Sequence, residues 1–494
     1  MTPSVVVVEL LLLVLCSSTL VAHGGDAETA KYMVIETSSL EPKDSCTGHK
    51  IPPSDEPSVN STWTALHHVA GPCSPVPASN KGNTTTTVAS MADALAADER
   101  RVAYILKRLS GDTNGQNPMA FSETGSTKSV SDSKYGTQTG TGSTPHMLTT
   151  TATTDSAPVG TSAVTQTVII DSGSDIPWIQ CKPCPFPACH PTRDTLFDPS
   201  RSTTYAAVPC ASAACAQLGP YRRGCSPAPT SSQCQFGIVY GDGSTVTGTY
   251  SSDDLTLGPY DVIRGFRFGC AHADRGAAFS YDVAGTLALG GGTQSLVKQT
   301  ASRYGSVFSY CLPPTPSSLG FLTLGVPPQR SPPAFVATPL FGSVVAPTFY
   351  MVRLRGIVVA GTPIAVAPAT FAAGSVIDSA TIVTRLPPTA YRALRAAFRA
   401  GMAAYKPAPP VSVLDTCYDF TGVRTVTLPS IAIVFDGGAT VNLDASAILL
   451  GSCLAFAPTA GDRMTGFIGN VQQKTLEVVY DIPGKAMRFR SAAC

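Results

Sequence analysis

The sequence predicts a mainly β protein built from two similar lobes. Only 14% of its 494 residues are charged, well below the usual share of about a quarter. Its 43 glycines and 41 prolines imply many turns, and short runs rich in Val, Ile, Thr and Phe lie between them. Such a pattern favours strands over helices. One strand-and-turn pattern also occurs twice, once in each half of the chain, which predicts two lobes of the same construction.

Each copy of this pattern ends an apolar strand in a carboxylate. The first spans 168–178 and places Asp171 at the tip of a tight turn, and the second spans 375–381 with Asp378 in the same position. One Asp-Ser-Gly turn is common, but two equivalent copies predict that the lobes bring the carboxylates together. Such a pair can share one proton, so that one member accepts a proton from water while the other donates one.

Composition limits the chemistry that the chain can perform. A net charge of +1 gives no electrostatic reason to expect nucleic acid as a partner. Beyond residue 150 the only histidines are His190 and His272, so Ser-His-Asp or Cys-His catalysis and most zinc sites are poorly supplied. We therefore expect carboxylate chemistry with no cofactor and no metal.

Fifteen cysteines indicate an oxidising compartment. Cys16, Cys46 and Cys73 precede the predicted lobes. The remaining twelve form an even number, consistent with six disulfides: Cys181, Cys184, Cys189, Cys210, Cys215, Cys225, Cys234, Cys270, Cys311, Cys417, Cys453 and Cys494. The run from Cys181 to His190 is interpreted as a disulfide-stapled loop in preference to a metal knuckle.

Residues 1–24 are predicted to be a secretory signal peptide. The apolar run from Val5 to Leu15 is too short to cross a bilayer, and small residues follow it up to Ala22. No later run reaches membrane-spanning length. We expect an exported monomer without a membrane span.

Residues 25–148 are predicted to be a propeptide and flexible linker. They contain two N-glycosylation sequons, at Asn60 and Asn83, and a Ser/Thr/Gly-rich stretch over about 121–165 that is typical of a cleavable segment. Apolar residues recur at helical spacing from Met91 to Leu109, with Arg100, Arg101, Lys107 and Arg108 on other faces. Two interpretations stay open: an amphipathic helix with a solvated basic side, or a propeptide helix that offers cations to an acidic cleft.

The rest is predicted to form a first lobe over 149–345 and a second over 346–494. Residues 236–250 alternate into and out of a Gly-Asp-Gly turn, which predicts a hairpin that could also act as a mobile lid. The Pro/Ser/Gly-rich segment 312–348 is interpreted as the connection between the lobes. Residues 389–405 are predicted to be a helix whose arginines form a solvated face.

From about residue 159 to 494 the chain resembles a secreted pepsin-family aspartic protease of the nepenthesin-like plant subgroup. The resemblance implies an all-β, bilobal fold with two β-barrel-like lobes, short helices and a cleft that binds a polypeptide substrate. It assigns Asp171 and Asp378 as the catalytic pair, Tyr240 as the flap tyrosine and Trp178 as its partner. Residues implied to support the carboxylates are Ser172, Gly173, Ser174, Ser379, Ala380 and Thr381, and those of the flap turn are Gly241, Asp242 and Gly243.

The resemblance also implies a pattern of disulfides and a location. The cysteine-rich run 181–234 is similar to an insertion typical of the subgroup. The implied pairs are Cys181–Cys184, Cys210–Cys234, Cys215–Cys225, Cys417–Cys453 and Cys311–Cys494. The expected location is the extracellular or cell wall space, with the vacuole as an alternative.

Two glycines of the family pattern are replaced by Ala288 and Ala380, and the expected tyrosine-bearing first strand is Thr/Ser-rich over 149–158. An added methyl group where backbones approach closely disfavours activity more than folding. The leading hypothesis is an acid-favouring endopeptidase made as a zymogen. The alternative is a non-catalytic binding protein on the same scaffold, such as a glycosidase inhibitor. A structural wall protein would leave the paired motifs unexplained.

Overall fold

The computed structural model describes residues 31–40, 45–46, 61–68, 72–73, 91–111, 148–154, 164–192, 194–227, 232–257, 261–276, 283–327 and 334–494. The predicted signal peptide, Asn60, Asn83 and most of the predicted flexible stretch lie outside these ranges. Residues 148–154 of that stretch form a strand, contrary to the prediction, because β-branched threonines suit a pleated surface and the strand has partners to pair with.

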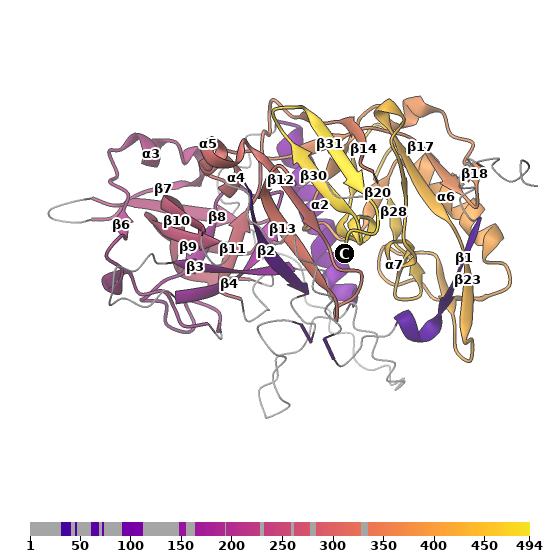
Figure 1. Ribbon diagram of the computed structural model, residues 1–494, viewed down its shortest axis with the longest axis horizontal. Helices are drawn as coiled ribbons and strands as arrows, with labels where there is room; N and C mark the ends of the chain where they lie inside the picture. The colour runs from indigo at the N-terminus through magenta and orange to yellow at the C-terminus, as the bar shows by residue number, and fades with distance from the viewer. Residues whose placement is uncertain are drawn as a thin grey trace, which may run out of the picture.

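One large sheet runs through the first lobe and continues into strands from the C-terminal end of the chain (Figure 1). Within the described residues it has 15 strands, and β6 (Ala206–Ala207) pairs with β9 off the main path. The order along that path is β14 (Val336–Pro339), β31 (Ala486–Arg490), β30 (Glu477–Asp481), β12 (Val307–Cys311), β13 (Leu319–Gly325), β2 (Ser61–His68), β3 (Leu148–Thr154), β4 (Val164–Asp171), β11 (Gly285–Ala288), β5 (Trp178–Gln180), β10 (Asp261–Arg275), β9 (Thr245–Leu257), β8 (Cys234–Val239) and β7 (Arg222–Cys225).

Smaller sheets build the second lobe, so the fold is mainly β and bilobal. The largest orders as β15 (Phe341–Gly342), β16 (Tyr350–Val352), β19 (Ser375–Ile377), β29 (Gly466–Ile468), β20 (Thr384–Leu386) and β28 (Phe456–Pro458). Two four-stranded sheets order as β18 (Thr362–Pro363), β17 (Leu354–Val359), β24 (Ile431–Phe435) and β25 (Thr440–Asn442), and as β21 (Lys406–Ala408), β22 (Cys417–Asp419), β27 (Cys453–Leu454) and β26 (Leu449–Leu450).

The predicted helix over 91–109 is confirmed as α2 (Met91–Leu109), which crosses the middle of the molecule in Figure 1. The helix predicted over 389–405 is α6 (Pro388–Gly401), which ends earlier because β21 begins at Lys406. None of the helices in the described ranges is both long and apolar enough to cross a bilayer. The short α-helices are α3 (Ala213–Ala216), α4 (Leu296–Gln299), α5 (Ala301–Tyr304) and α7 (Ala445–Ile448). The 3₁₀ helices are η1 (Thr37–Leu40), η3 (Pro199–Arg201), η4 (Gly219–Tyr221), η6 (Pro368–Phe371), η7 (Asp436–Gly438) and η8 (Asn470–Gln473).

Two strands from the region predicted as propeptide pair with the lobes. β1 (Tyr32–Glu36) pairs antiparallel with β23 (Thr425–Pro429) in the second lobe. β2 lies between β13 and β3 and so forms part of the large sheet. The described part of this region is therefore attached to both lobes by strand pairing and by α2.

The segment 312–348 is more than the predicted connection. It contributes β13 to the large sheet beside β12, and β14 beside the C-terminal strand β31. Its prolines and glycines fall mainly outside β13 and β14, which is why composition alone suggested a linker. An aromatic cluster lies nearby, in which Phe308, Tyr350 and Tyr480 contact one another.

All twelve cysteines of the lobes pair, but three expected pairings are wrong. Cys417–Cys453 and Cys311–Cys494 form as expected. The observed bonds in place of the wrong ones are Cys181–Cys270, Cys184–Cys189, Cys210–Cys225 and Cys215–Cys234, and the propeptide region adds Cys46–Cys73.

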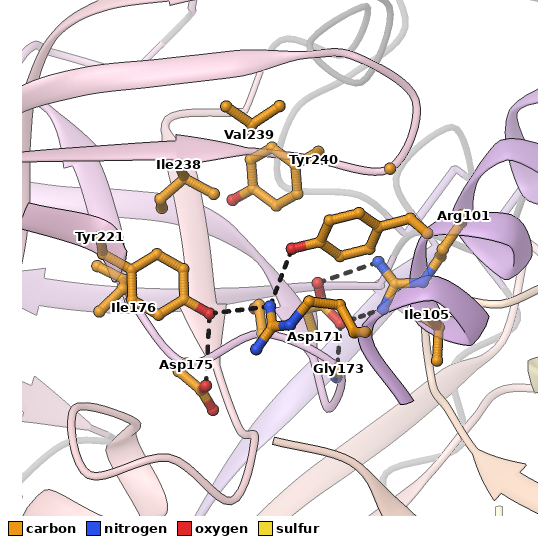
Figure 2. A pocket seen from close by; sticks show the side chains of 14 residues that line it. Arg101, Ile105, Asp171, Gly173, Asp175, Ile176, Tyr221, Ile238, Val239 and Tyr240 are labelled. Atoms are coloured by element: carbon orange, nitrogen blue, oxygen red, sulfur yellow. Dashed lines mark hydrogen bonds and ion pairs between the residues drawn. The ribbon is translucent and has the colours of Figure 1, made fainter. Parts of the chain in front are cut away.

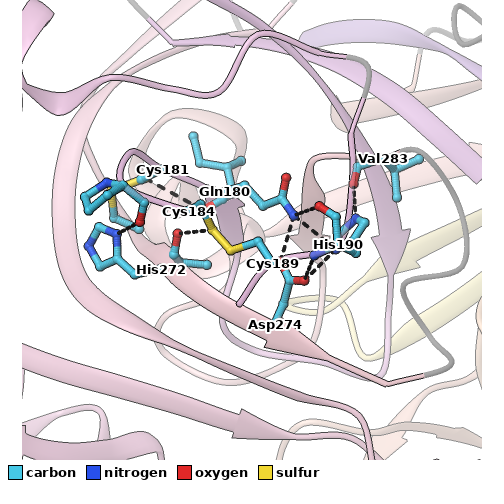
Figure 3. Close-up of a disulfide and its surroundings, with 12 residues drawn as sticks. Gln180, Cys181, Cys184, Cys189, His190, His272, Asp274 and Val283 are labelled. Atoms are coloured by element: carbon cyan, nitrogen blue, oxygen red, sulfur yellow. Dashed lines mark hydrogen bonds and ion pairs between the residues drawn. A yellow bond between two sulfur atoms is a disulfide. The ribbon is translucent and has the colours of Figure 1, made fainter. Parts of the chain in front are cut away.

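Strand register explains the first of the corrections. β5 pairs in parallel with β10, which brings Cys181 beside Cys270 and leaves Cys184 to bond Cys189. Cys210, Cys215 and Cys234 are all buried in one apolar cluster and Cys225 lies on the exposed strand β7, so neither burial nor spacing distinguishes the two other observed bonds from the expected ones. Figure 3 shows the Cys184–Cys189 bond next to the side chains of His190 and Asp274.

Candidate active site

Equivalent strands deliver the two predicted aspartates to the same place. β4 ends at Asp171 and β19 ends immediately before Asp378. Each strand lies beside a parallel partner, β11 for β4 and β29 for β19. The backbone oxygen of Asp171 accepts from the Leu289 amide at 2.8 Å, and the Asp378 amide donates to Ile468 at 3.2 Å. The same local geometry therefore positions both carboxylates.

The turns that follow the aspartates are bonded to each other across the lobe boundary. The Ser172 amide donates to Oγ of Ser379 at 3.0 Å, and the Ser379 amide donates to Oγ of Ser172 at 2.9 Å. These reciprocal bonds are buried. Each lobe thus fixes the position of the turn that follows the other lobe's aspartate.

Most of the predicted supporting residues reach the carboxylates. The Gly173 amide donates to Asp171 at 2.8 Å, and the Ala380 amide donates to Asp378 at 3.4 Å. Thr381 donates its hydroxyl to Asp378 at 2.6 Å. Ser174 does not make the corresponding bond, since its buried hydroxyl oxygen has no hydrogen-bond partner among the described residues. The two lobes are therefore not fully equivalent.

Neither alanine that replaces a family glycine has a left-handed backbone conformation, since Ala288 and Ala380 are absent from the residues with positive φ. The expected objection from backbone conformation therefore does not apply. Close contacts do exist in the first lobe, where a Cβ built on Gly173 would lie 2.5 Å from Nη2 of Arg101 and 2.9 Å from Oδ1 of Asp378. The longer hydrogen bond donated by the Ala380 amide is a second difference between the two turns, in addition to that between Ser174 and Thr381.

Helix α2 places the guanidinium of Arg101 between the two carboxylates. Its Nη2 lies 2.7 Å from Oδ1 of Asp171 and 2.9 Å from Oδ1 of Asp378, and its Nε lies 2.7 Å from Oδ2 of Asp378. Because one nitrogen binds both side chains, the two carboxylates are immediate neighbours. Asp171 is 4% exposed and Asp378 is fully buried. Figure 2 shows Arg101 extending from the helix toward Asp171.

Arg101 favours the ionised form of Asp378. Burial raises the pKa of Asp378, but the charge of Arg101 and the hydrogen bonds from Arg101 and Thr381 outweigh burial and leave this pKa below its usual value. The carboxylates hold the pKa of Arg101 well above its usual value although the side chain is buried. The cations of α2 are thus not all solvated. Arg101 matches the second interpretation, in which the helix offers a cation to an acidic cleft.

The predicted hairpin, β8 and β9, forms beside α2. Tyr240 at its tip accepts a hydrogen bond from Nε1 of Trp178 at 2.7 Å. A Cβ built on Gly241 would lie 2.7 Å from Cβ of Tyr104 and 2.9 Å from Cα of Arg101, so this glycine lets the turn contact the helix backbone. Asp242 accepts from the Ser244 amide at 2.9 Å and orders the turn, in which Gly243 has a φ of +89°.

A pocket remains beside Asp171, between the hairpin and α2 (Figure 2). Arg108 fills its far side, with Nη1 3.0 Å from the Tyr104 hydroxyl and 3.5 Å from the Tyr221 hydroxyl. Asp175 lies deeper and accepts from Thr348 at 2.6 Å. The arrangement is a covered pocket lined by Asp171, whose carboxylate is adjacent to that of Asp378 through the shared contact with Arg101.

Comparison with known proteins identifies the family. The family models described as Xylanase inhibitor N-terminal and Xylanase inhibitor C-terminal match residues 156–326 and 349–491. An aspartyl protease family protein of Arabidopsis thaliana is 35% identical over 494 residues, with 98% of each chain covered. The chain belongs to the plant pepsin-like aspartic protease family. Aspartic proteinase nepenthesin-2 of Nepenthes gracilis is 32% identical and covers 68% of this chain and 76% of its own.

Solved structures share the fold of this aspartic protease homologue. Basic 7S globulin from soybean has a TM-score of 0.54 at 20% identity and covers 70% of this chain and 91% of its own. Conglutin gamma from lupine seeds has the same TM-score and identity. The resemblance inferred from the paired motifs and the expected mainly β, bilobal fold are both confirmed.

Sequence reasoning missed part of this family member's cleft. Asp98, one turn before Arg101 on α2, is buried and lies 2.9 Å from Nη2 of Arg385. Its other oxygen accepts from the Ile382 amide at 2.6 Å. The three-residue spacing of Asp98 and Arg101 places them on one helix face and was the available signal. The partner of Asp98 could not be read from the chain.

In this aspartic protease homologue, Tyr240→Phe is expected to lower the free energy of unfolding by about 1–3 kcal/mol, because the buried Nε1 of Trp178 loses its acceptor. Urea denaturation at neutral pH measures the change. Tyr32→Phe is the matched control, since Tyr32 is 46% exposed, and should change stability by less than about 0.5 kcal/mol. Equal effects of both substitutions would show that the Trp178 bond contributes nothing.

Proposed function

We propose that the protein is an acid-favouring aspartic endopeptidase made as a zymogen. The observation that carries the proposal is the single guanidinium bound by both Asp171 and Asp378, which makes the two carboxylates neighbours at the base of a cleft. Burying two adjacent like charges is unfavourable, and a non-catalytic scaffold gains nothing from carboxylates in this position.

The proposed reaction begins once α2 has left the cleft. Without Arg101, the adjacent aspartates share one proton. The ionised carboxylate accepts a proton from a water molecule, which attacks the peptide carbonyl, while the protonated carboxyl donates to the carbonyl oxygen. The carboxyl that took the proton from water then donates it to the leaving nitrogen as the C–N bond breaks. At the same time a hydroxyl of the tetrahedral intermediate returns its proton to the other aspartate, which restores the shared proton of the pair. Ser172, Ser379 and Thr381 would keep the carboxylate planes fixed through these transfers.

Helix α2 is the proposed inhibitory element. It contacts both aspartates through Arg101 and the flap turn at Gly241, and it packs Leu95 and Ile105 against the second lobe. A substrate could not lie in the same space. Cleavage in the chain between α2 and β3 would allow the helix to leave, and the predicted signal peptide and disulfides fit a secreted enzyme.

The proposal is tested with purified full-length precursor. Incubation at pH 3–4 should produce cleavage of a denatured protein substrate, and an inhibitor directed at the aspartate pair should abolish it. The same precursor held at pH 7 should show little activity. Absence of cleavage at acid pH, or cleavage that resists the inhibitor, would contradict the endopeptidase.

The alternative function is that of a binding protein which inhibits a glycosidase. It is favoured by the names of the matching family models, both described as parts of a xylanase inhibitor. An inactive precursor that nevertheless inhibits a microbial xylanase would support it. The intact aspartate pair favours the protease.

Ala380→Gly is expected to raise turnover by up to about fivefold, which corresponds to about 1 kcal/mol of transition-state stabilisation. The reason is that the Ala380 amide lies 3.4 Å from Asp378, whereas the Gly173 amide lies 2.8 Å from Asp171. Removal of the methyl group should let the turn close on the carboxylate. The measurement is kcat on one peptide, with Ala288→Gly for comparison. Unchanged or reduced kcat would show that the methyl group does not hold the turn open.

A further inference from the structure

We infer that Arg385 and the backbone amide of Ile382 form a subsite for a carboxylate of the substrate, close to the bond that is cleaved. The inference rests on the proposed endopeptidase function and names a feature of its substrates. It starts from the carboxylate that already occupies this position, that of Asp98 on α2.

The subsite has the donors that a carboxylate requires. One oxygen of Asp98 accepts from the Ile382 amide at 2.6 Å, and the other lies 2.9 Å from Nη2 of Arg385. Glu99 lies 3.1 Å from Nη1 of the same guanidinium. A planar guanidinium combined with a fixed amide recognises a carboxylate by geometry as well as by charge.

The subsite is also rigid and buried. The side chain of Arg385 is only 4% exposed and its Nε has no hydrogen-bond partner among the described residues. Its backbone lies on β20, which pairs with β29 at Phe467, and β29 in turn pairs with β19, which leads to Asp378. One sheet therefore positions both the cation and a catalytic aspartate.

Departure of α2 would leave this cation without an anion. Both ion-pair partners recorded for Arg385 within the described ranges, Asp98 and Glu99, belong to that helix. A buried guanidinium without a partner is unfavourable, so a substrate that supplies a carboxylate gains binding energy there. The helix thus reveals what the subsite accepts.

The position of Asp98 also indicates where the substrate carboxylate lies. Asp98 precedes Arg101 by three residues, or about 4.5 Å along the helix axis. Residues of an extended peptide are spaced by about 3.3 Å. An aspartate or glutamate within about two residues of the cleaved bond would therefore reach Arg385.

The test uses acid-activated full-length protein and amidated peptides that carry Glu or Gln at each of three positions on either side of one cleaved bond. Assays at pH 5.5 keep the glutamate ionised. At one position the Glu peptide should have a kcat/KM about 10- to 100-fold above that of its Gln counterpart. This ratio should fall to about one in Arg385→Gln and stay unchanged in Arg392→Gln, an exposed arginine of α6.

Arg385→Gln could impair folding, because it leaves Asp98 buried beside an uncharged partner. The double variant Arg385→Gln with Asp98→Asn avoids this and should show the same loss of preference. A second peptide set with free C-termini distinguishes a side-chain carboxylate from a terminal one. Equal cleavage of Glu and Gln peptides at every position, with or without a free C-terminus, would overturn the subsite but leave the protease intact. Failure to cleave any peptide would overturn both.

Discussion

Replacement of Asp378 by asparagine should reduce the kcat/KM of peptide hydrolysis by at least about 10³-fold, since proton transfer by a positioned side chain typically contributes a factor of about 10²–10⁴. The asparagine is nearly the same shape and can still accept hydrogen bonds from Thr381 and Arg101. The precursor should therefore fold, and the loss should reside in the chemical step. A fluorogenic peptide at pH 4, after acid treatment, provides the measurement.

The control for this prediction compares the two single aspartate substitutions with the double variant. Asp171→Asn should be as damaging as Asp378→Asn, and the double variant should be no worse than either, because the aspartates act as one unit. Asp462→Asn, at an exposed carboxylate that accepts from Thr389, should leave activity unchanged. Additive losses from the two active-site substitutions would mean that the carboxylates act separately, contrary to the shared guanidinium.

Local sequence signals predicted the elements that carry the site. The two strands that end at Asp171 and Asp378 were evident because a β-branched run followed by a turn residue is a signal within a few neighbouring residues. Helix α2 was predicted with its observed bounds for the same reason, since its apolar spacing continues from Met91 to Leu109. The flap hairpin was marked by its Gly-Asp-Gly turn.

Signals that depend on distant partners were not available. Nothing in the spacing of Cys181 distinguishes Cys184 from Cys270, which becomes its neighbour only when β5 pairs with β10. The sequence offered four cations on α2 and could not select Arg101, because that choice depends on how the helix is rotated in the cleft. That rotation is set by contacts such as the buried pair of Asp98 with Arg385.

Because α2 is oriented so that Arg101 lies between the aspartates, Arg101→Met is expected to have the other large effect, on precursor stability and on activation. At pH 7 the precursor should lose about 3 kcal/mol of stability, the low end for a broken buried ion pair, because the freed carboxylates can share a proton. The pH dependence should change as well. With Arg101 present the pKa of Asp378 is lowered, so its stabilising contribution is complete above its ordinary value of 3.8 and is lost as the pH falls through the lowered value.

The contribution of Asp98 to precursor stability has the opposite pH dependence. Burial raises its pKa against the opposing charge of Arg385, so its contribution to precursor stability grows as the pH falls through the raised value. Arg101 also lowers the pKa of Asp98, so this contribution is not identical in the wild type and in Arg101→Met. Because the larger opposing charge is that of Arg385, which both proteins keep, the difference between them reports chiefly on the interaction of Arg101 with the aspartates.

Loss of about 3 kcal/mol corresponds to an open population about 100-fold larger. Arg101→Met should therefore cleave peptide above pH 5, where the proposed wild-type zymogen would be closed. The pH of half-maximal activation and urea unfolding at pH 7 measure the two effects. Arg100→Gln removes an exposed charge from the adjacent position of α2 and should leave both unchanged. An unchanged activation pH in Arg101→Met would mean that the closed state depends on the pair of Asp98 and Arg385 instead. Arg101 would then block the aspartates without controlling the departure of α2.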